Sequence, residues 1–225
     1  MRKNIEKKIK PLDKKFFFVS IFFLILILIS QYYPINKDDT FQNISLAIVF
    51  MLVIPILFIK IVLKEKLESY GFKLITKKKV IFNIILFLMI VLVLFLALFK
   101  YILIKQNYNL PLIFHQYFLS FFLLEFLVMS LVLLLIEVFF RGVIQFFLEQ
   151  YFSSIKAILL QSILFFLLLY FSGSKNEILE WPFLQLILIA PLAGWIAKES
   201  KSWFYSWLFS WLFMILSDAI IIYFK

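Results

Sequence analysis

The sequence predicts an all-α fold, a polytopic transmembrane helical bundle of about seven spans, and three observations support this prediction. The 225 residues are 64% hydrophobic and 20% aromatic, with a mean hydropathy of +1.03, whereas soluble domains are about half apolar. Apolar runs of about 20 residues, the length that crosses a bilayer as a helix, recur along the chain. The basic residues gather in alternate connecting segments, as they do in multi-pass proteins.

Each predicted span is an apolar run between two polar segments. Residues 1–15 form a basic cytoplasmic tail, and no signal peptide is expected because no small-residue cleavage site follows the first apolar run. Residues 16–225 form a single transmembrane domain, in which Pro55 and Pro191 are expected to kink their helices. The fourth span is long enough to tilt. The spans cover residues 16–33, 44–63, 80–104, 113–140, 155–172, 181–197 and 203–224.

The lysines and arginines predict the orientation of the chain. With the N-terminus in the cytoplasm, all 23 basic residues lie on the cytoplasmic side except Lys37, Lys100, Lys105, Lys175 and Lys225. This is the positive-inside pattern of a multi-pass protein of the cell membrane. It accounts for most of the net charge of +10 without a nucleic-acid partner, and it favours contact with anionic lipid. Frequent Phe, Ile, Lys and Asn hint at a bacterial genome, hence at a bacterial inner membrane.

The segment between the second and third spans is amphipathic. Leu67, Tyr70, Phe72 and Leu74 alternate with lysines and Glu68. Such a pattern is typical of chain that lies in the membrane interface rather than across the bilayer. We therefore expect this segment at the cytoplasmic surface of the membrane.

Cysteine and histidine are almost absent. The lack of Cys excludes disulfides, thiolate metal sites and a Cys nucleophile. His115 is the one histidine, and a zinc site needs several His, Cys or carboxylate ligands. The sequence therefore predicts no cofactor, and no self-contained zinc site.

Glu137 and Arg141 stand out because no charged residue lies between Phe126 and Ile136. A carboxylate at the end of such an apolar helix is costly to bury and needs a partner. Arg141 is four residues further on, on the same helical face and within reach. The simplest interpretation is a structural ion pair that closes the cytoplasmic end of the bundle. A pair in this place can also shape a ligand pocket.

Four segments, at 67–73, 137–142, 162–165 and 193–196, resemble in order and spacing the CPBP family, the CAAX proteases and bacteriocin-processing or immunity membrane proteins. The second segment, Glu-Val-Phe-Phe-Arg-Gly, is the most specific. The resemblance implies a CPBP-type helical core over about residues 67–218. It also implies an intramembrane peptidase chemistry, in which a leading Glu and two His position and activate a water that attacks an amide, with or without a metal.

Three residues of the family's motifs are present in this chain. The family's first motif is Glu-Glu-x-x-x-Arg, and its second Glu and its Arg correspond to Glu137 and Arg141. The Phe of the second motif, Phe-x-x-x-His, corresponds to Phe165. The resemblance therefore implies that these three residues keep a structural or pocket role.

The residues that look catalytic in the family are replaced. The leading Glu position is Ile136, and the His of the second motif is Leu169. Counted from Gly194, the third motif places its His at Ser210 and its Asn at Met214. Ile, Leu and Met neither accept a proton nor bind a hard metal, and a lone serine is a poor base. Ser210 is therefore predicted as a pocket residue that hydrogen-bonds.

Other acids are the remaining catalytic candidates beside Glu137. Asp218 lies on the same helical face as Ser210. Glu125 is about 18 Å from Glu137 along a helix, too far for two carboxylates to share one water, and it needs a partner on another helix or a proton. His115 is expected to be an interfacial side chain. The sequence motifs of intramembrane aspartyl proteases, rhomboids and zinc metalloproteases are absent.

The leading functional hypothesis is a catalytically inactive relative of the CPBP proteases, a pseudoprotease. It would bind a membrane or envelope protein, as a scaffold or in bacteriocin immunity. The first alternative is an active intramembrane endopeptidase with a non-standard site around Glu137, helped by Asp218 or Glu125. The second is a small transporter or channel component, in which Glu125, Glu137 and Asp218 line an ion path.

Overall fold

The computed structural model describes residues 11–32, 40–73, 78–105, 123–172 and 181–224. These residues form seven helices and one short 3-10 segment, with no strand among them. The all-α prediction is therefore confirmed. The fourth predicted span began at residue 113, and that start lies outside the described residues.

Each of the seven helices corresponds to one predicted span. α1 covers Lys14–Tyr32, and the second helix is continuous from α2 (Thr40–Ile48) through η1 (Val49–Val53) and α3 (Ile54–Leu57) to η2 (Phe58–Val62). After η3 (Leu67–Tyr70) comes α4 (Lys78–Lys105). The fourth helix joins η4 (Leu124–Met129), α7 (Ser130–Glu137), η5 (Val138–Gln145) and α8 (Phe146–Leu148), and is followed by α9 (Ser154–Ser172), α10 (Trp181–Ser200) and α11 (Trp203–Phe224).

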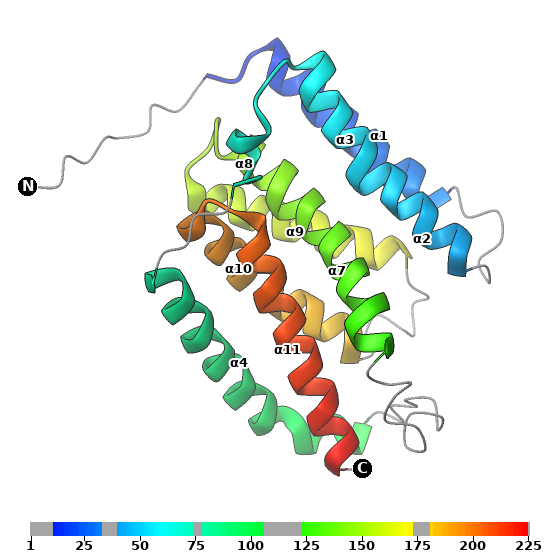
Figure 1. Cartoon of the computed structure of the whole chain (residues 1–225), viewed down its shortest axis with the longest axis vertical. Helices are drawn as coiled ribbons and strands as arrows, with labels where there is room; N and C mark the ends of the chain where they lie inside the picture. The colour runs from blue at the N-terminus through cyan, green and yellow to red at the C-terminus, as the bar shows by residue number, and fades with distance from the viewer. Residues whose placement is uncertain (1–10, 33–39, 74–77, 106–122, 173–180, 225) are drawn as a thin grey trace, which may run out of the picture.

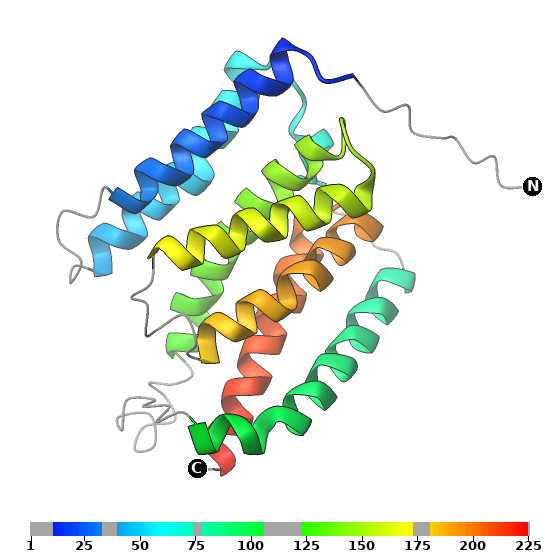
Figure 2. The same cartoon turned by 180° about the vertical axis from the view of Figure 1, so that it is seen from behind.

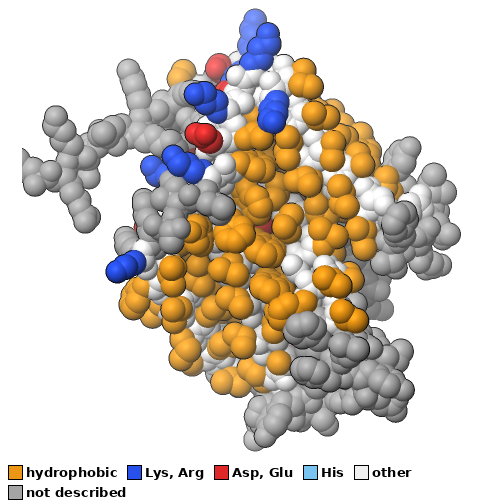
Figure 3. Space-filling view, in the orientation of Figure 1, with side chains coloured by type: hydrophobic (Ala, Val, Ile, Leu, Met, Phe, Trp, Pro, Cys, Tyr) orange, Lys and Arg blue, Asp and Glu red, His pale blue; other side chains and the backbone are white. Residues whose placement is uncertain are grey.

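Three helices of the described chain are long and apolar enough to cross a membrane, by length and composition: Ile44–Val62, Phe126–Leu148 and Trp203–Ile220. Two shorter apolar stretches, Val80–Val93 and Ser154–Tyr170, accompany them. The outer surface is apolar as well: Figure 3 shows hydrophobic side chains over most of one face, with the basic side chains gathered toward one end. A soluble monomer rarely exposes so large an apolar area, and the chain is a membrane protein.

The helices are arranged around the fourth helix. Figures 1 and 2 show α1 beside the second helix at one side of the bundle and α4 at the opposite side. Between them, the fourth helix packs against α9, α10 and α11. α10 and α11 also pack against each other and against α4.

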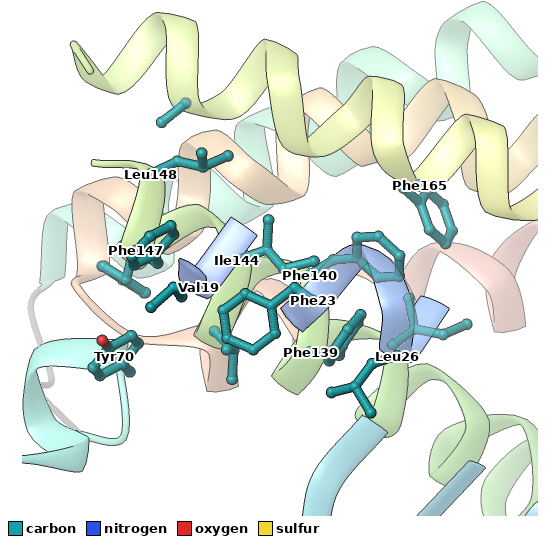
Figure 4. Packing of buried hydrophobic residues seen from close by; sticks show 14 of the residues in the cluster. Val19, Phe23, Leu26, Tyr70, Phe139, Phe140, Ile144, Phe147, Leu148 and Phe165 are labelled. Carbon is teal, nitrogen blue, oxygen red and sulfur yellow. The ribbon is translucent and has the colours of Figure 1, made fainter. Parts of the chain in front are cut away.

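Two apolar clusters hold this arrangement together. The first joins α1, the second helix, the fourth helix and α9, and is rich in phenylalanine (Figure 4). Within it, the rings of Phe22 and Phe58 are stacked with centroids 3.7 Å apart, and Phe23 meets Phe139 edge to face. The second cluster joins α4, α10 and α11 around Phe209 and Phe213. Aromatic pairs of this kind stabilise by more than the area they bury.

The fourth helix continues further than the sequence predicted. The predicted span ended at residue 140, whereas the helix runs to Leu148. The polar residues Arg141 and Gln145 do not end the helix, because they are buried against other helices. Glu137 and Arg141 therefore lie within the helix, and the predicted end of the fourth span is corrected.

The amphipathic segment after the second helix folds back onto the bundle. Tyr70, at the end of η3, is completely buried, and Phe72 packs edge to face on Trp203 with centroids 5.7 Å apart. Gly71 ends η3 with φ of 79°, and a Cβ there would collide with the ring of Phe146. Only glycine adopts this conformation without strain. The aromatic side chains expected at the membrane surface are thus partly used for packing within the protein.

Candidate functional site

The carboxylate of Glu137 is the centre of a buried polar cluster. The hydroxyl of Ser210 donates a hydrogen bond to Oε1 at 2.8 Å, and the hydroxyl of Ser206 donates to Oε2. Nη1 of Arg141 lies 3.4 Å from Oε1. All four side chains are buried. Both carboxylate oxygens are therefore occupied by groups of the protein itself.

The local sequence explains why these four side chains meet. Glu137 and Arg141 are four residues apart on the fourth helix, and Ser206 and Ser210 are four apart on α11, so each pair shares one helical face. α7 and α11 pack against each other. Nε1 of Trp207 also donates a hydrogen bond of 3.0 Å to the carbonyl of Ser130, which ties the two helices in register.

Arg141 is a buried cation with few partners. Its guanidinium carbon lies 4.9 Å from the ring centroid of Phe165, a cation–π arrangement. Nε and Nη1 donate no hydrogen bond, so the contact with Glu137 is an ion pair through Nη1 alone. A buried charge is tolerated only when it is compensated. The charge of Glu137 thus compensates the buried charge of Arg141, and the charge of Arg141 compensates that of Glu137.

The structure brings together all four residues that the sequence predicted as structural or pocket residues. Glu137 contacts Arg141 and Ser210, and Arg141 contacts Phe165. They come from three different helices, the fourth, α9 and α11. These four residues form one cluster at the centre of the bundle. The structural or pocket role of each stays a prediction.

The positions that correspond to the family's catalytic residues carry no polar chemistry except at Ser210. Ile136 and Leu169 belong to the first apolar cluster, and Met214 is buried on α11. Ser210 reaches a carboxylate, which is the geometry of an activated nucleophile. However, Ser210 is 0% exposed and Glu137 is 1% exposed, so a substrate carbonyl finds neither group on an accessible surface.

Of the other candidates, only Asp218 has a side chain that the structure describes, and it lies apart from this cluster. Asp218 is two helical turns beyond Ser210, about 12 Å along the axis of α11, and is 4% exposed. Glu125 belongs to η4, but its side chain lies outside what the structure describes, and so does His115. Their catalytic or interfacial roles remain untested.

The donors around Glu137 do not fit a metal ion. A hard divalent cation takes several carboxylate or carbonyl oxygens, and zinc takes His, Cys or acidic ligands. The cluster offers one carboxylate and two hydroxyls, with the positive charge of Arg141 at 3.4 Å. Within the described ranges, no three His, Cys, Asp or Glu side chains group together.

The polar cluster extends further than sequence reasoning indicated. Nε2 of Gln145 donates to the carbonyl of Gly194 at 2.8 Å and to Oε1 of Glu149 at 3.2 Å. Nε2 of Gln161 approaches the carbonyl of Ala190 at 3.5 Å. Gln145 was not singled out as a site residue. The signal was present, because Glu137, Arg141, Gln145 and Glu149 repeat every four residues on one face of an otherwise apolar helix.

Comparison with known proteins gives one match. Residues 116–216 match the family model of the Rce1-like type II CAAX prenyl endopeptidases. The matched range contains the whole cluster around Glu137 and the positions of Ile136, Leu169 and Met214, but not Asp218. No curated protein and no solved structure matches the chain. From the start of the fourth span to α11, the chain is similar to the Rce1-like type II CAAX prenyl endopeptidases, which confirms there the family resemblance read from the sequence.

Proposed function

We propose that this protein is a non-catalytic relative of the CAAX endopeptidases, which keeps the helical core of the family to bind a membrane or envelope protein. The observation that carries the proposal is the state of Glu137. Its two carboxylate oxygens are occupied by Ser206, Ser210 and Arg141 in a buried cluster. A general base must lie within hydrogen-bond reach of the water that it activates, and the side chain of Glu137 is only 1% exposed.

The surroundings of the cluster support the same proposal. Water activation needs polar groups that converge on the water. The positions that would supply them carry Ile136 and Leu169, which pack in the first apolar cluster, and the buried Met214. Apolar side chains at these positions stabilise the core and offer water no partner.

The alternative of an active endopeptidase needs a second acid near Glu137. Asp218 lies about 12 Å beyond Ser210 along α11, whereas a shared water spans two hydrogen bonds of about 3 Å each. The contact between Glu137 and Ser210 leaves one route, a serine nucleophile with a carboxylate base. Catalysis by this route would contradict the proposal.

A cleavage assay distinguishes the two. The full chain in nanodiscs would be incubated with a farnesylated peptide that ends in a CAAX sequence, and the products read by mass spectrometry. We expect the wild type to release no more product than Glu137→Gln or Ser210→Ala, while a competent CAAX endopeptidase cleaves in parallel. Cleavage by the wild type that both substitutions abolish, with the helical content and thermal midpoint retained, would overturn the proposal.

The binding role is tested by isolation from the native membrane. The wild type would be purified in mild detergent, and the proteins that remain bound in stoichiometric amount identified by mass spectrometry. Leu127→Ser and Phe126→Ser change the exposed surface of the fourth helix, and Lys60→Gln on the second helix is the matched control. We expect the wild type and the control Lys60→Gln to retain a bound membrane or envelope protein, in contrast to Leu127→Ser and Phe126→Ser. A wild type that carries no protein would contradict the scaffold and immunity roles.

A further inference from the structure

An apolar groove lies between α4, α9 and α10, on a face that Glu137 does not reach. Its volume is about 330 Å³, at the small end of the range of ligand sites. α10 packs against both other helices. The lining includes Phe87 from α4, Ile158 and Leu159 from α9, and Pro191, Leu192 and Trp195 from α10. With only such side chains, the groove suits hydrocarbon.

Two lysines lie at one end of this groove. α9 and α10 run antiparallel, because Gln161 approaches Ala190 while a Cβ on Gly194 would touch Ile158. The start of α9 and the end of α10 are therefore at the same end of the bundle. Lys156 lies on that side, three residues before Leu159, and Lys198 three residues after Trp195, so each shares a helical face with a groove residue.

Lys198 is already held at the mouth of the groove. Its Nζ lies 4.3 Å from the centroid of the Trp195 ring, a cation–π contact that fixes the charge next to the apolar surface. Lys156 is exposed at the start of α9. Tryptophan and lysine side by side are typical of the level of lipid headgroups. The positive charges thus lie beside an apolar surface, as the headgroup of a phospholipid lies beside its acyl chains.

We propose that this groove binds an anionic glycerophospholipid, with an acyl chain along Leu159 and Pro191 and the phosphate between Lys156 and Lys198. A hollow of this volume with two basic groups at one end is complementary to both parts of such a lipid. The site is separate from the cluster around Glu137. It does not depend on whether the protein cleaves peptides or binds another protein.

Brominated lipids test the proposal, because bromine quenches tryptophan fluorescence on contact. The full chain would be reconstituted in phosphatidylcholine vesicles that contain a fixed minor fraction of brominated phosphatidylglycerol, or the same fraction of brominated phosphatidylcholine. We expect stronger quenching by the anionic lipid. The difference should disappear in Trp195→Phe, which leaves the four other tryptophans in place.

Charge and shape variants give the matched controls. Each of Lys156→Gln and Lys198→Gln should reduce the preference for the anionic lipid roughly fivefold. Leu159→Phe should block the groove without adding another tryptophan. Lys60→Gln, which removes an exposed lysine on the second helix, should leave the preference unchanged. Equal quenching by both lipids, or an equal loss in Lys60→Gln, would mean ordinary contact with bulk lipid and would overturn the proposal. Thermal midpoints of all variants show whether the fold is retained.

Discussion

At the scale of single residues, the buried charges of Glu137 and Arg141 decide how the centre of the bundle is stabilised. The charge of each side chain compensates the charge of the other. Nη1 of Arg141 lies 3.4 Å from Oε1 of Glu137, and both side chains are almost completely buried. Removal of one partner of a buried ion pair usually costs more than removal of both, because it leaves an uncompensated charge. The pair is therefore best tested by a double-mutant cycle.

We expect Arg141→Met to lower the free energy of unfolding by about 3–5 kcal/mol, because the carboxyl group of Glu137 is then left in an apolar core without its partner. Glu137→Leu combined with Arg141→Met should lose clearly less than the sum of the single changes. Reversible unfolding in mixed micelles, followed by circular dichroism, gives the three values. Additive losses would show that the pair contributes no coupling.

At Gly194, α10 lies close to side chains of both the fourth helix and α9. A Cβ there would lie 2.9 Å from Nε2 of Gln161 and 3.1 Å from both Oε1 of Gln145 and Cγ2 of Ile158. We expect Gly194→Ala to lower the free energy of unfolding by about 1–3 kcal/mol. The measurement is the same unfolding titration, with Gln161→Ala added to provide space. If that second change restores nothing, crowding at Gly194 is not the cause.

At the scale of elements, η3 and the start of α1 are tied together at one end of the bundle. Asp13 caps α1 by accepting a hydrogen bond of 2.9 Å from the backbone N–H of Phe16. Lys15 pairs with Glu65, and the hydroxyl of Tyr70 donates to Glu65 at 2.5 Å. The hydroxyl of Tyr151 donates to Asp13 at 3.4 Å. The contacts of Glu65 and Tyr70 fix η3 against α1.

The two tyrosines make this connection sensitive to alkaline pH. Burial, and then the hydrogen bond to Glu65, raise the pKa of Tyr70, and burial and the charge of Asp13 raise the pKa of Tyr151. An unfolded tyrosine loses its proton near pH 10, while the folded ones keep theirs. Their stabilisation is therefore complete below about pH 10 and is lost as pH rises from there toward the raised pKa values.

We expect the thermal midpoint to fall as the pH rises above about 10. The fall should be smaller in Tyr70→Phe combined with Tyr151→Phe, although these variants start from a lower midpoint. Glu65→Gln should reduce the fall only in part, because burial is the larger cause for both tyrosines. Circular dichroism in detergent across this range gives the midpoints. An unchanged pH dependence in the double variant would contradict the assignment.

At the scale of the whole molecule, exposed apolar side chains cover the outside of the bundle and charges gather toward one end (Figure 3). Core and surface are thus both largely apolar, which suits a lipid environment. The distribution of the lysines and arginines in the sequence predicts that the charged end faces the cytoplasm.

Single cysteines test this orientation, because the chain has none of its own. Ser153 is exposed between α8 and α9, and Lys225 ends the sequence. With a maleimide that does not cross membranes, we expect Ser153→Cys to react in inside-out vesicles and Lys225→Cys in right-side-out vesicles. The opposite pattern would reverse the predicted orientation.

The sequence predicted the helices well and their ends less well. Long apolar runs leave no alternative to helix, since every backbone polar group must find its partner within the segment. The end of the fourth helix was misjudged because Arg141, Gln145 and Glu149 resemble the polar boundary of a span. Only their neighbours on α9, α10 and α11 show that they are buried.

By itself, the sequence determined the helical class, the number of helices and the pairing of Glu137 with Arg141, because length, hydropathy and the spacing of four residues act locally. The tertiary structure decided that Ser206 and Ser210 occupy the carboxylate, that Phe165 covers the guanidinium, and that α4, α9 and α10 enclose a groove. These contacts join helices far apart in the chain. Which faces meet depends on how whole helices pack, and no local spacing encodes it.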